Sequence, residues 1–241
     1  MIEQILPYGN TGEKGEQVRL MFDKIASRYD RLNRIMSLGF DKRWRKNAVD
    51  WLRPYYPKKI LDVACGTGDL SIMLRRQFSQ ANITGVDVSE EMMKIARHKT
   101  DKTGEYVMFE YQDCMLLTYP DCSFDTVTVA FGVRNFGNIE RGISEMYRVL
   151  RPEGHVLILE LSTPEGFPMS FLFKIYSSIY IPFIGGILSP DSSAYKYLPV
   201  SIKAMPQGRD MTGILEKAGF KNIYFKRFTG GICTMYTAAK N

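Results

Sequence analysis

The chain has 241 residues and a net charge of +6, with 45% hydrophobic and 24% charged residues. This is the composition of an ordinary soluble protein, and the length suits one α/β domain with a sizeable core. Four cysteines without a C-x-x-C pair, and only two histidines, predict free thiols and no metal site. The excess of basic residues favours an anionic partner, without distinguishing a membrane from a nucleic acid.

The N-terminal part of the chain predicts two helices. The first is expected over 16–32, where apolar residues recur every three or four positions and form one face. These apolar residues are Val18, Phe22, Ile25, Tyr29 and Leu32. The second helix is expected over about 38–53 and is followed by two prolines.

From residue 59 onward, apolar runs alternate with predicted helices. Five runs, from KILDVA to HVLILEL, are separated by helical patterns, which predicts a parallel sheet covered on both faces. After a helix near 209–218, two further runs are joined by a turn too short for a crossover, so they must be antiparallel. We therefore expect a Rossmann-like α/β fold with a mostly parallel seven-stranded sheet and an antiparallel last strand.

One apolar segment, residues 167–188, is long enough to span a bilayer. It contains Lys174 and the prolines Pro168 and Pro182, so we expect a buried or membrane-facing segment in place of a spanning helix. The N-terminal MIEQILPYGN lacks the charged and apolar regions of an export signal. These features predict a cytoplasmic protein.

The first apolar run ends in a glycine-rich turn, LDVACGTGDL, which suggests a ligand site at the carboxyl end of a strand. Gly66 and Gly68 would let the backbone approach a ligand closely. A dinucleotide is disfavoured because Ser71 replaces the third glycine of its fingerprint, and Asp69 stands where the pyrophosphate would lie. Two like charges in contact cost roughly 1–4 kcal/mol.

A cationic nucleoside without phosphate has the opposite requirement, and S-adenosylmethionine is such a ligand. Asp62 and Thr67 would face its methionine part, while Asp87 would accept the ribose hydroxyls. Asp113 would take the adenine amino group beside Cys114. Each acid alone could be a helix cap or a turn residue, but one acid after each of three successive strands indicates a cofactor site.

The pattern DVACGTGD, then VDVS, then QDC resembles the class I S-adenosylmethionine-dependent methyltransferases. Residues 29–45 and 131–154 resemble two signatures of the quinone-biosynthesis C-methyltransferases, and SAYKYLPVSIKAMPQ resembles their substrate-side loop. The resemblance implies methylation of demethylmenaquinol to menaquinol, with the ubiquinone precursor left open as a second substrate. The expected cofactor-binding residues are Asp62, Gly66, Thr67, Gly68, Asp87, Val88, Asp113 and Cys114.

The resemblance also implies a division of the single domain. The parts are a helical cap over 1–57, a cofactor-binding half over 58–161, a substrate-side insertion over 162–208, and a C-terminal helix with two strands over 209–241.

Three residues are candidates for the chemistry at an acceptor ring carbon. Such a carbon is a good nucleophile only when the neighbouring hydroxyl is ionised. Arg134 can hold an oxyanion but cannot act as a base, and Asn135 lies beside it. Tyr29 could relay a proton, although its place on the apolar face of its helix favours core packing.

The resemblance implies a prenylated quinol as substrate, and a membrane surface is a second predicted partner. Segment 167–188 would receive the prenyl tail, and the basic cluster 42–46 around Trp44 would contact lipid headgroups on the cytoplasmic face of the inner membrane. A solvated basic face explains the cluster equally well. No nucleic acid is expected, because AFGVRNFG lacks the Asn/Asp-Pro-Pro-aromatic turn that grips an extruded base. Another phenolic or lipid acceptor, an RNA acceptor and homo-oligomerisation remain open.

Overall fold

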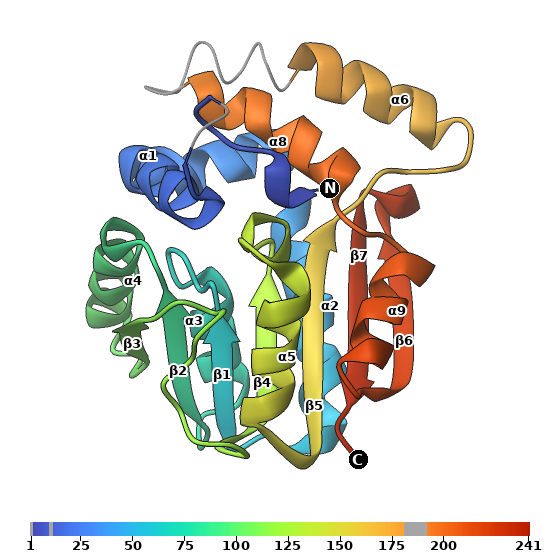
Figure 1. Ribbon diagram of the computed structural model, residues 1–241. Coiled ribbons are helices and arrows are strands. Elements are labelled where there is room, and N and C mark those ends of the chain that lie inside the picture. The colour runs from blue at the N-terminus through green and yellow to red at the C-terminus, as the bar shows by residue number, and fades with distance from the viewer. Residues whose placement is uncertain (1, 10–11, 181–191) are drawn as a thin grey trace.

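The computed structural model describes residues 2–9, 12–180 and 192–241. A seven-stranded sheet in the order β3-β2-β1-β4-β5-β7-β6 forms its centre, with helices on both faces (Figure 1). Strands β1 to β5 are parallel, and β7 runs antiparallel to both β5 and β6. This confirms the predicted sheet. The strands are β1 (Lys59–Val63), β2 (Asn82–Asp87), β3 (Met108–Tyr111), β4 (Phe124–Ala130), β5 (Leu150–Leu161), β6 (Lys221–Phe228) and β7 (Cys233–Ala239).

Alternate residues of the central strands pack into two separate cores. Leu61 of β1 and Ile158 of β5 face the core shared with α5 (Ile139–Val149) and α9 (Arg209–Lys217). Their neighbours Ile60 and Leu157 face the core on the other side of the sheet. That side is covered by α2 (Phe40–Leu52), α3 (Asp69–Gln77) and α4 (Glu90–Thr103). Burial on both faces explains why these strands read as continuous apolar runs.

Two helices begin at side-chain caps, and one strand begins earlier than the sequence predicts. The side chain of Ser89 caps α4 by accepting a hydrogen bond from the backbone N–H of Met92 (3.3 Å), as its position predicts. Asn138 caps α5 in the same way. Strand β5 begins earlier than expected, at Leu150, so RPEG lies within the strand; Glu153 there has φ +61°.

A helical cap covers the carboxyl ends of the parallel strands (Figure 1). It comprises α1 (Lys14–Met36), α6 (Met169–Ile175) and α8 (Ser192–Ala204). Val18 and Ile25 of α1 share a third apolar cluster with Tyr195 and Tyr197 of α8. The shorter helical turns are Ile2–Gln4, Arg53–Tyr55, Val133–Asn135, the π turn Tyr176–Tyr180, and Thr229–Gly231.

Within the described ranges, no helix is both long and apolar enough to cross a membrane. The segment 167–188 is described as far as residue 180, where it forms α6 and the π turn. Residues 181–188 of that segment lie outside the described residues.

Candidate active site

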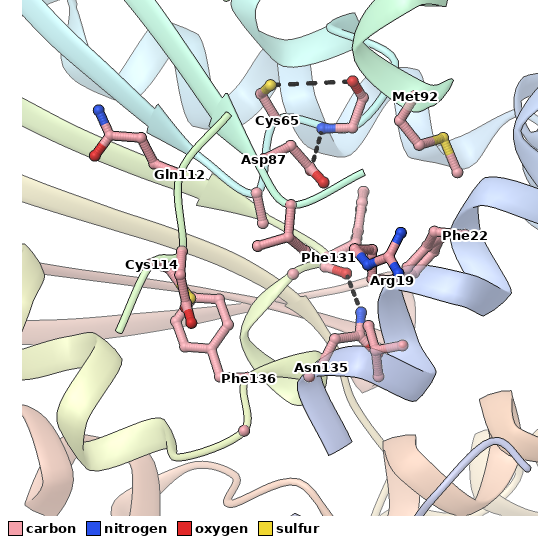
Figure 2. Close-up of a pocket in the computed structure, with 18 of the residues that line it drawn as sticks. Arg19, Phe22, Cys65, Asp87, Met92, Gln112, Cys114, Phe131, Asn135 and Phe136 are labelled. Atoms are coloured by element: carbon pink, nitrogen blue, oxygen red, sulfur yellow. Dashed lines mark hydrogen bonds between the residues drawn. The ribbon is translucent and has the colours of Figure 1, made fainter. Parts of the chain in front are cut away.

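Two adjoining clefts lie between the sheet and the cap. The larger, about 590 Å³, opens at the carboxyl ends of β1 to β4, and we call it the polar cleft (Figure 2). The smaller, about 210 Å³, is lined mainly by apolar side chains, and we call it the apolar cleft. Tyr29, Arg45 and Phe131 line both clefts. The polar cleft lies where strand order reverses between β1 and β4, the place where open α/β sheets bind ligands.

Asp62 of β1 is a buried carboxyl at the edge of the polar cleft. It accepts hydrogen bonds from the hydroxyls of Ser71 and Thr128, the latter at 2.9 Å. Burial raises the pKa of Asp62 to about 6, although both hydrogen bonds favour the charged form. A cationic ligand would favour its ionisation further.

Asp87 at the end of β2 is held by backbone donors. Its two carboxyl oxygens accept hydrogen bonds from the N–H groups of Gly66 and Ser89, each at 2.8 Å. Burial raises its pKa to about 6, against the effect of these bonds. Figure 2 shows Asp87 facing the cleft, with Arg19 and Phe22 of α1 on the opposite wall. The carboxyl position is therefore fixed before any ligand arrives.

The two glycines of the turn have different roles. Gly66 lines the polar cleft at φ +56°, and a Cβ there would point into open space. Gly68 does not line it, which differs from the prediction. A Cβ on Gly68 would lie 2.9 Å from that of Ala96 on α4, so packing of the turn on α4 requires this glycine.

The repulsion predicted between Asp69 and a pyrophosphate at the turn is weaker than expected, because Asp69 is paired with a lysine. Lys99 of α4 pairs with Asp69 at 2.6 Å and with Asp30 of α1 at 2.5 Å. Asp69 is therefore not a bare negative charge. The hydroxyl of Thr67, which lines the cleft, donates to Asp30 at 2.5 Å.

The remaining predicted cofactor residues also line the polar cleft. Val88, Asp113 and Cys114 all do so. The Asp113 side chain is exposed, and one of its oxygens accepts a hydrogen bond from the N–H of Met115 at 2.8 Å. Cys114 is half-buried beside it, and Figure 2 places Cys114 and Phe136 on one wall of the cleft. This wall offers one acid and flat apolar contacts, which suits a nucleobase with an amino group.

Arg134 is a buried residue of the short helix after β4 and lines the apolar cleft, not the polar one. Its Nη1 forms an ion pair with Glu160 at 2.7 Å and also donates to the carbonyl oxygen of Phe131. Its Nε–H is buried without a hydrogen-bond partner among the described residues. Burial opposes the charge, yet Glu160 and nearby tyrosines hold the pKa of Arg134 above its ordinary value.

Asn135 and Tyr29 lie at the junction of the clefts. Asn135 lines the polar cleft, and its Oδ1 accepts a hydrogen bond from the hydroxyl of Tyr197 at 3.2 Å. Tyr29 is half-buried and lines both clefts, and burial raises its pKa. Phe22 packs edge-on against Tyr29 with 5.8 Å between ring centres. The three catalytic candidates thus lie around one junction.

Arg45 is a site residue whose position differs from the prediction. It was expected on an exposed basic face with Trp44, but both side chains are buried, so neither can contact lipid headgroups. Arg45 pairs with Asp41 at 2.6 Å, and its guanidinium lies 5.0 Å from the ring centre of Phe131. Helical periodicity could have revealed this, because Asp41 and Arg45 share a face with the buried Leu52.

The chemistry of the polar cleft fits S-adenosylmethionine. Carboxyl groups lie at or just beyond the carboxyl ends of three neighbouring parallel strands, at Asp62, Asp87 and Asp113. They match an ammonium, a ribose diol and an adenine amino group in turn. Gly66 leaves open space at the turn between the first two.

Solved structures similar to this one support the fold. A methyltransferase of Thermotoga maritima, described as S-adenosylmethionine-dependent and a possible histamine N-methyltransferase, aligns with a TM-score of 0.67 over 93% of this chain and 100% of that one, at 18% identity. The [4+2]-cyclase SpnF aligns with a TM-score of 0.67 over 94% of this chain and 96% of its own, at 19% identity. Identities this low show the fold alone.

Sequence relatives match over almost the whole chain. Demethylmenaquinone methyltransferase of Bacteroides fragilis is 50% identical over 99% of this chain and 98% of its own. The Geobacter sulfurreducens protein named ubiquinone/menaquinone biosynthesis C-methyltransferase UbiE is 42% identical over 95% of this chain and 90% of its own. The sequence model of one family matches residues 10–240. The chain belongs to the ubiE/COQ5 methyltransferase family.

Proposed function

We propose that this chain methylates a ring carbon of a prenylated hydroxy-naphthoquinol, converting demethylmenaquinol to menaquinol with S-adenosylmethionine as donor. One observation carries the proposal: a cleft lined with carboxyl groups meets an apolar cleft at Tyr29, Arg45 and Phe131. The first suits a cationic nucleoside and the second an apolar ring with a tail. The relatives named as demethylmenaquinone methyltransferases support this acceptor.

On the donor side, the protein mainly has to bind and orient. S-adenosylmethionine supplies a methyl group activated by its sulfonium. Asp62 and Thr67 hold the methionine part, and Asp87, next to Gly66 and Val88, holds the ribose. Asp113 and Cys114 receive the adenine. Correct alignment of two reactants can supply about 7–11 kcal/mol of the barrier.

On the acceptor side, the apolar cleft has to stabilise a charged oxygen. Arg134 offers a permanent positive charge within a largely apolar wall. Such a charge is worth more there than in water. Tyr29 is protonated at neutral pH, as a phenol ordinarily is, and burial raises its pKa further, so it donates a hydrogen bond or passes on a proton. Asn135, fixed by Tyr197, orients the ring.

The test is methyl transfer by the purified chain to short-tailed demethylmenaquinol kept reduced, followed by mass spectrometry. We expect a product heavier by one methyl group and no product from the oxidised quinone, whose ring carbon is not a nucleophile. Absence of product with active cofactor binding would contradict the proposal. In cells, deletion of the gene should accumulate a quinone lacking one methyl group.

A second acceptor, the ubiquinone precursor, is favoured by one observation: the relatives named for both pathways are 40–42% identical to this chain. A competition assay with equal amounts of both acceptors gives the ratio of kcat/KM directly. RNA and another phenol serve as further acceptors in the same assay. A higher kcat/KM for RNA or for the other phenol would make that acceptor the substrate in place of the naphthoquinol.

We also propose that the chain works in the cytoplasm at the inner membrane surface, where a prenylated acceptor resides. Its positive net charge supports this location. Homo-oligomerisation stays a prediction, and light scattering of the eluting protein during size-exclusion chromatography would test it.

A further inference from the structure

Helix α6 and the π turn after it carry large apolar side chains that face solvent. Phe171 and Ile179 are 57% and 65% exposed, and Phe167, just before the helix, is 86% exposed. Phe171, the exposed Ile175 and Ile179 recur every four residues along the helix and the π turn, which places them on one side, and Phe167 precedes the helix. We call these four residues the outer strip. Soluble monomers rarely leave such a group of apolar side chains in water.

The other side of the same helix lines the apolar cleft. Phe173 is buried there, and Met169 and Tyr176 also line it. Leu172 and, from the turn between α1 and α2, Leu38 line the cleft while remaining 52% and 68% exposed. These two residues form the apolar rim of the cleft. Figure 1 shows α6 at the outer edge of the cap, away from the C-terminus.

The chain segments that carry the strip and the rim hold an excess of basic side chains, and the acid just before the strip, Glu165, is paired with Arg227 at 2.6 Å. Residues 167–180 contain one charged side chain, Lys174. Residues 31–46 include the exposed Arg31, Arg34, Lys42 and Arg43, whereas their only acid, Asp41, is buried and paired with Arg45. A surface of this kind is complementary to anionic lipid headgroups.

We propose that the outer strip and the apolar rim dock on an anionic lipid bilayer. The apolar cleft then opens toward the bilayer, and a prenyl tail passes from lipid into the cleft without crossing water. The passage of a prenyl tail rests on the proposed function, whereas the docking on a bilayer does not depend on it. A second copy of the chain fits less well, because two positive faces repel and mutual contact at the rim would close the cleft to an acceptor.

The test is flotation with vesicles of phosphatidylglycerol and phosphatidylcholine. The double variant Phe171→Ser/Ile175→Ser should partition to vesicles at least about tenfold less than the unchanged protein, because it removes two large apolar contacts. The matched control is Met108→Ser/Leu116→Ser, which alters two apolar residues exposed elsewhere, and it should partition normally. Vesicles of phosphatidylcholine alone should bind less, as should all vesicles at high salt.

A second measurement does not depend on loss of binding. A tryptophan introduced by Phe171→Trp should be quenched by lipids brominated on their acyl chains, and one introduced by Met108→Trp should not. Equal binding of the double variant, no binding of the unchanged protein, or dimers that the double variant abolishes would each overturn the proposal.

Methylation of a water-soluble, tail-less naphthoquinol separates this proposal from the proposed function. The double variant should retain that activity and lose activity toward long-tailed acceptor in vesicles. Vesicle binding without any methylation would reject the function alone, and methylation without vesicle binding would reject the docking alone.

Discussion

Arg134 combines a buried positive charge with one hydrogen-bond donor that has no partner among the described residues. Arg134→Lys keeps a charge opposite Glu160 but removes the Nε–H and the planar group. We expect kcat to fall about 10²-fold, as when one oxyanion donor is lost, with the Kd of S-adenosylmethionine unchanged. Lysine is the better probe than alanine because alanine would leave Glu160 buried without a partner. Unchanged kcat would remove Arg134 from the mechanism.

Asp62 and Asp87 give cofactor binding a pH dependence. Burial raises the pKa of each carboxyl to about 6, so each is ionised above that pH and neutral below it. Below about pH 6, protonation removes the charge of Asp62 that attracts the ammonium and makes Asp87 a weaker acceptor for the ribose hydroxyls. The Kd should therefore rise by up to about tenfold per pH unit for each group. Calorimetric titration from about pH 8 to about pH 5 measures this. Asp62→Asn should bind weakly with a shallower slope, and an equally steep slope would assign the effect to other groups.

In the protein without cofactor, the same two carboxyl groups make the free energy of unfolding fall as the pH rises, whereas cofactor binding strengthens as the pH rises. Their pKa values in the folded state exceed those of the unfolded chain, so the folded state holds these protons more tightly. Their contribution to the free energy of unfolding is present below about pH 4 and is lost as the pH rises to about 6. Bound cofactor offsets part of this lost stability, because it binds the folded state.

At the scale of elements, helix α1 is fastened to the cofactor loops by two carboxylates seven residues apart. Asp23 accepts a hydrogen bond from the Ser89 hydroxyl at 2.6 Å, and Asp30 accepts one from Thr67. Asp30→Ala leaves Thr67 without its acceptor and Lys99 with Asp69 alone. We expect a free energy of unfolding lower by about 1–3 kcal/mol and faster hydrogen exchange along α1.

The control for this variant is Lys46→Ala, which breaks a solvent-exposed pair with Asp50 on α2. Its free energy of unfolding should change by no more than about 0.5 kcal/mol, and exchange in α1 should stay as before. If both variants exchange alike, the two carboxylates do not fasten α1.

The elements were predictable from the sequence because each of them obeys local rules. Strands buried on both faces leave apolar runs, Ser89 marks the start of α4, and parallel strands bring Asp62 and Asp87 to one edge. The pairing of Arg134 with Glu160 and of Thr67 with Asp30 was not predictable. The partners lie 26 and 37 residues apart, and only the docking of the cap on the sheet brings the second pair together. The packing contact that requires Gly68 was not predictable for the same reason, since its neighbour is Ala96 on another helix.

Across the whole molecule, one helix connects the two clefts. The loops after β1 and β2, which line the polar cleft, are bound to α1 through Asp30 and Asp23, and Tyr29 of the same helix lines the apolar cleft. We therefore expect a ligand in the polar cleft to restrict Tyr29, which on the proposed function contacts the acceptor. Any such effect is reciprocal, because by linkage each ligand changes the affinity for the other by the same factor.

This coupling is measurable without catalysis, because S-adenosylhomocysteine lacks the transferable methyl group. We expect it to lower the Kd of a tail-less naphthoquinol about fivefold or more, and the naphthoquinol to lower the Kd of S-adenosylhomocysteine equally. Asp30→Ala should reduce both factors together, because it frees α1 from the turn after β1 while leaving the lining of the apolar cleft unchanged. Fluorescence titration of each ligand with and without the other gives all four constants. A factor of one in the unchanged protein would mean that the clefts fill independently and that α1 carries no signal between them.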